Sequence, residues 1–337
     1  MKIKINKKRL ITILTLFFLL IIFIFLLFAA DFSFGHEPDW GVTFSRSYAL
    51  DLQLDWRQAY LAILDDLKVN HVRLSAYWDE IEPQKDQYNF TDLDWQIQQA
   101  TDRGVKIILA VGRRLPRWPE CHDPGWIKHY PPQDTNDEIL GMIRLLVERY
   151  QSNTQVVSWQ VENEPLFAWF GFCPAPDKEF LKKEIALVKS LDQTRPVLIT
   201  DTGELSNWQA AADLTDVLGT TMYRVVWNKH FGFFRYWFVP PAFYHYKALL
   251  AAAFNPNLKQ VMVTELQMEP WTGDKSMTQL TLAEQEKSFD LSQFQSNIKF
   301  ARKTGFKSVY LWGAEYWYWL KLKGHSQIWQ AAQELWR

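Results

Sequence analysis

Two short apolar segments of this sequence each run into a glutamate. Val156–Val161 is followed by Glu162-Asn163-Glu164-Pro165, and proline ends a central strand because it has no backbone N–H to donate. Val261-Met262-Val263-Thr264 is followed directly by Glu265. Two carboxyl groups flanking a glycosidic bond are the minimum for its hydrolysis, one as acid and the other as nucleophile or base. Glu164 and Glu265 are therefore the candidate catalytic pair.

Alternating elements must position these carboxylates. After residue 40, β-branched apolar runs alternate with amphipathic stretches, which indicates βα units and a parallel sheet. Strands are expected at Gly41–Phe44, His71–Ser75, Val105–Val111, Val156–Val161, Val197–Thr200, Val217–Met222, Gln260–Thr264 and Ser308–Leu311. Helices are expected near Trp56–Leu67, between Thr91 and Gly104, and near Asp137–Tyr150, Lys178–Leu191, Trp208–Leu214, Ala242–Ala253, Leu282–Lys303 and Ser326–Trp336.

Eight alternating pairs are the number that a closed (β/α)8 TIM barrel needs. No GxGxxG follows the first strand, so a dinucleotide-binding open sheet is excluded. In such a barrel the chemistry sits at the carboxyl ends of the strands. The fourth and seventh strands then lie across the mouth, so that Glu164 and Glu265 can face each other. Strand alternation puts Glu162 on the same side but one layer deeper, where a structural role is expected.

The sequence resembles clan A glycoside hydrolases, the family 5 cellulase-like enzymes and their relatives, over residues 39–337. Asn163-Glu164-Pro165 is similar to the acid/base signature of the clan, and Glu265 is similar to its nucleophile. Arg73 matches an arginine that supports the nucleophile, Tyr223 a tyrosine that hydrogen-bonds it, and Trp312 the floor of the −1 sugar subsite. The resemblance implies a retaining double displacement on β-linked oligo- or polysaccharides, with no cofactor and no metal.

The sequence departs from the family 5 pattern at two places. Thr221 stands where a histidine commonly precedes the tyrosine of the sixth strand, and Gly112-Arg113-Arg114 replaces a histidine after the third strand. These changes point to subsites unlike those of a standard cellulase. Electrostatics agree with the assigned roles, because Arg73 would keep Glu265 ionised while Glu164 needs a less charged, partly buried position. Asn163 would donate to the sugar 2-hydroxyl.

Two alternatives remain open from the sequence. A catalytically inactive glycan-binding barrel is disfavoured by the intact pair, and a transglycosylase would use the same residues. Further polar and aromatic residues follow the strands and are equally compatible with subsites or with scaffold: Glu204, Trp208, Glu315, Trp317, Trp118, Trp126, Trp169 and Trp271. The aromatic-rich run Phe231–Phe238 is expected to be a loop that packs on the barrel, lines the cleft or touches a membrane surface.

Residues 1–30 form a segment distinct from the catalytic domain, residues 31–337. Lys2, Lys4, Lys7, Lys8 and Arg9 precede 21 uncharged, apolar residues from Leu10 to Ala30. That length approaches the ~20 residues of a membrane-spanning helix, whereas cleaved signals have ~7–15 apolar residues. We therefore expect an uncleaved, single-pass anchor in the cell membrane with the domain outside; cleavage would instead make the protein secreted.

The charge and the cysteine content restrict the classes of partner that the protein is expected to bind. Five of the 37 basic residues lie in residues 1–30, which leaves 32 basic against 38 acidic residues and a formal charge of −6. A mildly acidic domain argues against nucleic acid, and no cysteine and histidine cluster has zinc spacing. We expect a monomer that binds carbohydrate. Cys121 and Cys173 follow adjacent strands, so a disulfide between them is expected to brace the rim of the site.

Overall fold

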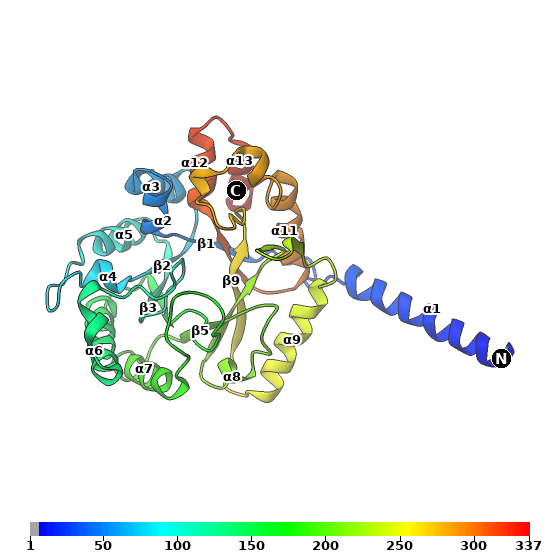
Figure 1. The fold of residues 1–337 in the computed structure, drawn as a ribbon, viewed down its shortest axis with the longest axis horizontal. Coiled ribbons are helices and arrows are strands. Elements are labelled where there is room, and N and C mark those ends of the chain that lie inside the picture. Colours follow the sequence, from blue (N-terminus) through cyan, green and yellow to red (C-terminus); the bar gives the residue numbers. More distant parts are fainter. Residues whose placement is uncertain (1–6) are drawn as a thin grey trace.

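The computed structural model describes residues 7–337, and within them eight parallel strands close into a barrel (Figure 1). Neighbouring strands follow the order β1-β10-β9-β6-β5-β4-β3-β2, and β1 pairs with both β10 and β2 to close the ring. The strands are β1 Asp39–Thr43, β2 His71–Ser75, β3 Lys106–Val111, β4 Val156–Val161, β5 Val197–Asp201, β6 Val217–Met222, β9 Gln260–Gln267 and β10 Ser308–Trp312. The predicted (β/α)8 barrel is confirmed, with every strand within a few residues of its expected place.

Helices form the outer layer around the barrel (Figure 1). They are α2 Arg46–Asp51, α3 Trp56–Asp65, α4 Trp78–Ile81, α5 Thr91–Asp102, α6 Pro132–Tyr150, α7 Lys178–Leu191, α8 Gln209–Ala212, α9 Pro241–Phe254, α10 Leu282–Gln285, α11 Leu291–Lys303, α12 Ala314–Leu322 and α13 Gln327–Gln333. Helix α7 illustrates how they form: the Asp177 carboxylate caps its first turn, and Leu181, Ile185 and Val188 bury one face on the barrel.

The prediction of one continuous helix from Leu282 to Lys303 is wrong, because the structure has two separate helices there. A capping box at Thr281 starts the short α10, and the Asp290 side chain accepts a hydrogen bond from Gln293 N to start α11. Phe289 lies between the two helices and is almost fully buried against Phe294 and Tyr316. The free energy gained by burying the Phe289 ring exceeds the free energy that one continuous helix would gain. Helix α5 begins at Thr91 with Phe90 as its N-cap residue, and Gly104 follows the helix with φ +69°.

Two further differences concern strands. The run Phe231–Phe238 is not a plain loop, because Val225–Asn228 (β7) and Gly232–Arg235 (β8) pair as an antiparallel hairpin. Phe231 and Trp237 are largely exposed, so the hairpin is not simply packed on its own barrel. Strand β9 also continues past Glu265 to Gln267, with an irregular register against β6 between Thr220 and Thr221. Glu265 therefore projects from inside a strand.

The N-terminal segment forms helix α1, Lys7–Ala29, which projects away from the barrel (Figure 1). Its side chains are not buried and its mean hydropathy reaches 3.3. Among the described residues, α1 is the one helix that is both long enough and apolar enough to cross a membrane. Lys2 and Lys4 of the predicted basic flank lie outside the described residues. The prediction of an apolar N-terminal helix ahead of the barrel is confirmed.

Side chains from several strands fill the inside of the barrel. One internal layer comprises Ile108, Leu198, Val217, Met262 and Tyr310. Gly219 lies two residues after Val217 and on the same side of β6. An added Cβ there would lie 2.6 Å from the Thr264 methyl carbon and 2.7 Å from that of Thr200. Thr200 and Thr264 can pack against each other here only because Gly219 has no side chain.

Replacing Gly219 with alanine should therefore lower the free energy of unfolding by about 1–3 kcal/mol through overpacking. The matched control is Gly141→Ala on the exposed face of α6, where nothing lies within 4 Å of the added carbon. That change should stabilise by up to ~1 kcal/mol, because alanine is the better helix former. Urea unfolding of both variants checks the pair, and equal stabilities would contradict the packing argument.

Candidate active site

Arg73 of β2 lies at the centre of the barrel mouth and is fully buried. Its Nη1 donates to Glu265 Oε1 at 3.0 Å and its Nη2 to Asn163 Oδ1 at 2.8 Å. Its Nε donates to Gln160 Oε1 at 2.7 Å. One guanidinium thus joins β2, β4 and β9, and its charge is balanced by the Glu265 carboxylate.

Glu265 is held from two sides. Besides the Arg73 ion pair, it accepts a 3.2 Å hydrogen bond from the Tyr223 hydroxyl, which follows β6. Tyr223 is in turn fixed by a 3.1 Å hydrogen bond from its backbone N–H to Glu204 Oε1. Thr221, at the position of the family histidine, accepts a hydrogen bond from Gly203 N. The sequence-predicted residues Arg73, Tyr223 and Glu265 therefore come together.

The chain after β4 turns sharply through Glu162 and Glu164, which have φ of +58° and +46°. Such values are rare for residues with a side chain and persist only where surrounding bonds impose them. Here Asn163 N donates to Arg114 O, and Glu164 N donates to Thr200 Oγ1 at 2.7 Å. The turn aims both Asn163 and Glu164 at the mouth.

Glu162 has the structural role expected from the sequence. Its carboxylate accepts hydrogen bonds from the backbone N–H groups of Arg113 and Arg114, at 2.6 and 2.7 Å. A Cβ on Gly112, whose φ is +122°, would lie 2.3 Å from that carboxylate. The departure Gly112-Arg113-Arg114 from the family pattern therefore has a local reason: it makes room for Glu162 and supplies its donors.

Glu164 has a very different environment from Glu265. Burial raises its pKa well above the usual range, and the negative charges of Glu265 and Glu120 raise it further. A carboxyl group whose pKa is raised holds its proton to a higher pH than an exposed carboxyl group does. Glu164 is thus suited to donate a proton, as a general acid must.

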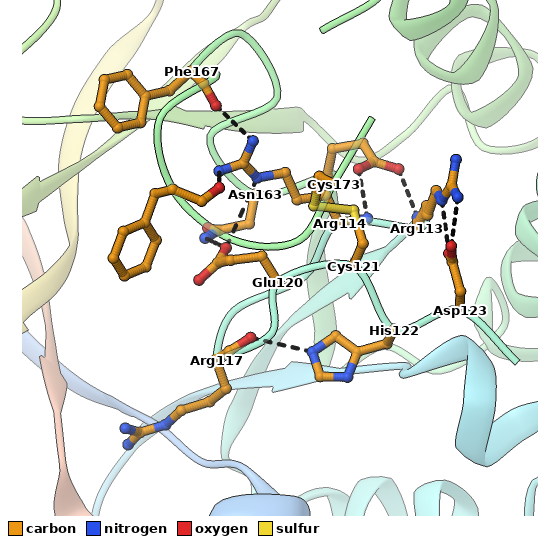
Figure 2. The surroundings of a disulfide bond; sticks show 12 residues. Arg113, Arg114, Arg117, Glu120, Cys121, His122, Asp123, Asn163, Phe167 and Cys173 are labelled. Carbon is orange, nitrogen blue, oxygen red and sulfur yellow. Dashed lines mark hydrogen bonds and ion pairs between the residues drawn. A yellow bond between two sulfur atoms is a disulfide. The ribbon is translucent and has the colours of Figure 1, made fainter. Parts of the chain in front are cut away.

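Glu120 is a third carboxyl at the site that sequence reasoning missed. Asn163 Nδ2 donates to its Oε2 at 3.1 Å. Burial, then the charge of Glu265, raise the pKa of Glu120 to about 8. Figure 2 shows Glu120 beside Asn163, next to the disulfide of Cys121. Its position directly before Cys121, which was expected at the rim, was the signal available in the sequence.

Trp312 at the end of β10 lies beside a buried ionic cluster. The Arg117 guanidinium carbon lies 4.0 Å from the centre of the Trp312 ring and 3.7 Å from that of Tyr48. Arg117 pairs with Glu269 and, at 3.5 Å, with Glu315. Arg117 thus covers one face of Trp312. Glu315 was a candidate from the sequence, whereas Arg117 and Glu269 were not.

The expected disulfide is present. Cys121 and Cys173 are bonded with their Cα atoms 5.3 Å apart, joining the loops after β3 and β4 (Figure 2). Arg114 reinforces this junction, since its guanidinium donates to the backbone carbonyls of Phe167 and Phe170. Both loops are therefore fixed at the rim of the site.

The secondary tryptophan candidates divide into two groups. Trp208, Trp317 and Trp126 donate their indole N–H to backbone carbonyls and belong to the scaffold. Trp118 and Trp169 are exposed at the rim. Trp271 packs edge-on against Tyr223 at 5.7 Å, and Phe170 links it to Trp118. These rim aromatics lead from the outer surface to Tyr223.

A closed parallel barrel with Glu265 in β9 and Glu164 just after β4 has the two carboxyl groups that glycoside hydrolysis needs. The chain belongs to the cellulase family, glycosyl hydrolase family 5, whose model matches residues 45–310. Among residues 7–337, no group of three or more histidine, cysteine, aspartate or glutamate side chains is arranged to hold a metal ion.

Known proteins similar to this chain include β-galactosidases. The chain is 27% identical over 148 residues to β-galactosidase LacA of Lactobacillus acidophilus, covering 37% of this chain and 22% of that protein. It is 25% identical over 181 residues to β-galactosidase BglY of Alicyclobacillus acidocaldarius, covering 47% and 24%. The chain thus spans less than a quarter of the length of these relatives.

Solved structures share the fold. Xylanase 10B of Thermotoga petrophila, in complex with xylobiose, superposes with a TM-score of 0.55 at 16% identity, covering 81% of each chain. A GH5_18 protein of Bifidobacterium longum in complex with Manβ1-4GlcNAc gives a TM-score of 0.56 at 14% identity, covering 82% of this chain and 69% of that one. At these identities the likeness establishes the barrel alone.

Replacing Glu120 with glutamine should shift the alkaline limb of the kcat/KM profile to lower pH. Above its pKa of about 8 Glu120 is ionised, and its negative charge then helps to raise the pKa of Glu164. Removing that charge lets Glu164 lose its proton at a lower pH. The profile is measured on a β-glycoside with a poor leaving group, because only such a substrate needs the Glu164 proton in its first step. The control Glu148→Gln, exposed on α6, should leave the limb in place. An unchanged limb or a shift to higher pH in Glu120→Gln would contradict this coupling.

Removing the disulfide should destabilise the folded protein. Cys121 and Cys173 are separated by 52 positions, and closing a loop of that size contributes ~4 kcal/mol in the chain-entropy model. The double variant with serine at both positions should lose a comparable free energy of unfolding. A reducing agent should lower the melting temperature of the parent protein but not of the variant. Two titratable thiols in the unfolded, unreduced parent would show that the bond does not form.

Proposed function

We propose that this protein is a retaining β-glycoside hydrolase that acts on β-linked oligo- or polysaccharide. The observation that carries the proposal is the contrast between two glutamates at one barrel mouth. Glu265 is paired with the Arg73 cation, whereas burial and neighbouring carboxylates raise the pKa of Glu164. Environments that differ in this way assign the nucleophile and the acid.

The proposed reaction is a double displacement. A Glu265 oxygen attacks the anomeric carbon while Glu164 gives its proton to the leaving glycosidic oxygen, which forms a covalent glycosyl-enzyme. Glu164, now ionised, then takes a proton from water as the water oxygen attacks the same carbon. Glu265 leaves as a carboxylate, and two inversions retain the β configuration.

The surrounding residues have supporting roles in this proposal. Arg73 and Tyr223 hold Glu265 in the attacking position. Asn163 has its carbonyl oxygen engaged by Arg73 and Thr200 and one N–H engaged by Glu120. Its second N–H remains for the sugar 2-hydroxyl. Trp312 offers its face away from Arg117 to the sugar ring in the −1 subsite.

The comparisons indicate the type of bond in the substrate more closely than they indicate the sugar. The similar proteins include β-galactosidases, and one fold relative was solved with Manβ1-4GlcNAc, so both names contain a β-linked sugar. A screen of aryl β-galactosides, β-xylosides, β-glucosides and β-mannosides alongside the matching polymers identifies the sugar. A transglycosylase would give longer products when acceptor sugars are added, and an inactive glycan-binding barrel would bind polymers without turnover.

We also propose that residues 1–30 anchor residues 31–337 to the outer side of the cell membrane. Helix α1 supports this by its length and apolarity. The Cys121–Cys173 disulfide supports an oxidising compartment outside the cytoplasm. The basic residues ahead of the apolar run should stay on the cytoplasmic side.

The mechanism is tested by removing each carboxyl group. Glu265→Ala should abolish turnover. Glu164→Ala should lower kcat/KM about 10²–10⁴-fold on substrates with poor leaving groups, the usual contribution of a general acid. With a good leaving group its first step survives, and azide should restore turnover as a β-glycosyl azide. Glu148→Gln controls for general damage.

Proton NMR of the first-formed reducing sugar gives the stereochemical result. The β anomer is expected from a β-linked substrate. An initial α anomer would assign the pair to an inverting mechanism and overturn the roles of Glu164 and Glu265. An α-glycosyl azide from Glu164→Ala would contradict them equally.

A further inference from the structure

Helix α9 has an apolar outer face that the barrel does not use. Tyr244 and Ala251 pack inward and are fully buried. On the outside, Leu249 is 53% and Phe254 73% exposed, and Phe243, Tyr246 and Leu250 are exposed as well. In the outer helices α3, α5, α6, α7 and α11, no large apolar side chain is exposed to this degree. A helix that is apolar on all sides is normally covered by something.

The connection to α1 fixes where this face lies. Phe32, three residues beyond α1, stacks on the His245 ring of α9 with ring centres 3.8 Å apart. Its backbone N–H donates to Lys303 O at the end of α11. A Cβ on Gly305 would lie 2.4 Å from Phe32 O, so the segment fits closely there. The end of α1 is therefore attached to α9 and not joined to the barrel by a free linker.

The direction of the two helices matters as well. Figure 1 shows α1 leaving the barrel beside α9 and α11, with α9 running crosswise to it. A bilayer crossed by α1 would thus lie roughly parallel to α9 and next to its outer face. Tyrosine and other amphipathic rings favour the headgroup region, and an apolar helix face lying in that region buries its side chains among acyl chains.

A groove runs along the same face. It has a volume of about 650 Å³ and opens between α9 and the segment after β5, with Leu27 of α1 at one side. Its apolar walls include Phe243, Leu250 and Phe254. Because α1 itself contributes to the lining, the groove is continuous with the surface that lipid acyl chains would cover.

We propose that α9 is a second membrane contact: its outer face and the adjoining groove lie in the lipid interface beside α1. This rests on the proposed anchoring of α1. The outer helices of a (β/α)8 barrel run along its strands, so a barrel resting on α9 lies on its side. Its mouth then opens along the membrane surface, toward glycans held close to the bilayer.

The test uses the full chain in liposomes of phosphatidylcholine and phosphatidylglycerol. Single cysteines carry a nitroxide label at Leu249→Cys or Phe254→Cys on α9, at Phe25→Cys in α1, and at Gln98→Cys on α5. The native cysteines are bonded to each other and do not react. Helix α5 follows β2, on the side of the barrel away from α9. Collision rates with oxygen, which concentrates in lipid, and with a nickel chelate, which stays in water, report each environment.

The expected result is that oxygen dominates at positions 25, 249 and 254, and the nickel chelate at position 98. If position 25 is in lipid while both α9 positions are in water, the second contact is wrong and the anchor stands. If position 25 is also in water, the anchor itself fails. Labels on α9 that are shielded from both reagents would indicate a protein neighbour, such as a second copy, and would overturn the lipid contact.

Discussion

The buried guanidinium of Arg73 is the interaction on which the site depends. A cation inside a barrel costs several kcal/mol unless charged and polar partners surround it. Here the partners are Glu265 of β9, with Gln160 of β4 and Asn163 immediately after it. The same contacts that compensate the charge also position the two sides of the candidate catalytic pair. The positions of β2, β4 and β9 and the geometry of the site are therefore coupled, and a change to one partner removes a hydrogen bond from a buried cation.

Three carboxyl groups share this mouth, and their surroundings separate them. Glu265 faces a cation, whereas Glu164 and Glu120 are buried, which together with neighbouring negative charge raises their pKa. Three ionised carboxylates so close would repel one another strongly in a medium that screens poorly. Protonation of two of them relieves that repulsion, and one of the two protons is the one that the proposed acid step needs. The crowding of acids thus contributes to the chemistry.

The sequence predicts the parts of the structure that repeat or that follow a strand. Strand positions could be read from apolar runs, and Glu164 and Glu265 from the residues that follow them. Glu120 and Arg117 could not be found in this way, because they lie in an irregular loop where no period applies. The same holds for the break before Asp290, which depends on burying Phe289, a tertiary effect that local patterns do not contain. The hairpin of β7 and β8 was missed because its aromatic residues are mostly exposed and show no clear alternation.

Backbone strain gathers where the candidate site is built. Glu162, Glu164, Arg117 and Glu120 all have positive φ, and all lie in the two loops that the disulfide joins. Each such residue costs on the order of 1–3 kcal/mol and persists only if its neighbours impose it. The neighbours here are the Glu162 carboxylate, the Arg114 guanidinium and the Cys121–Cys173 bond. The rim needs this reinforcement because its strained turns are what direct Glu164 and Glu120 inward, so the stability of the loops and the protonation of the site are parts of one arrangement.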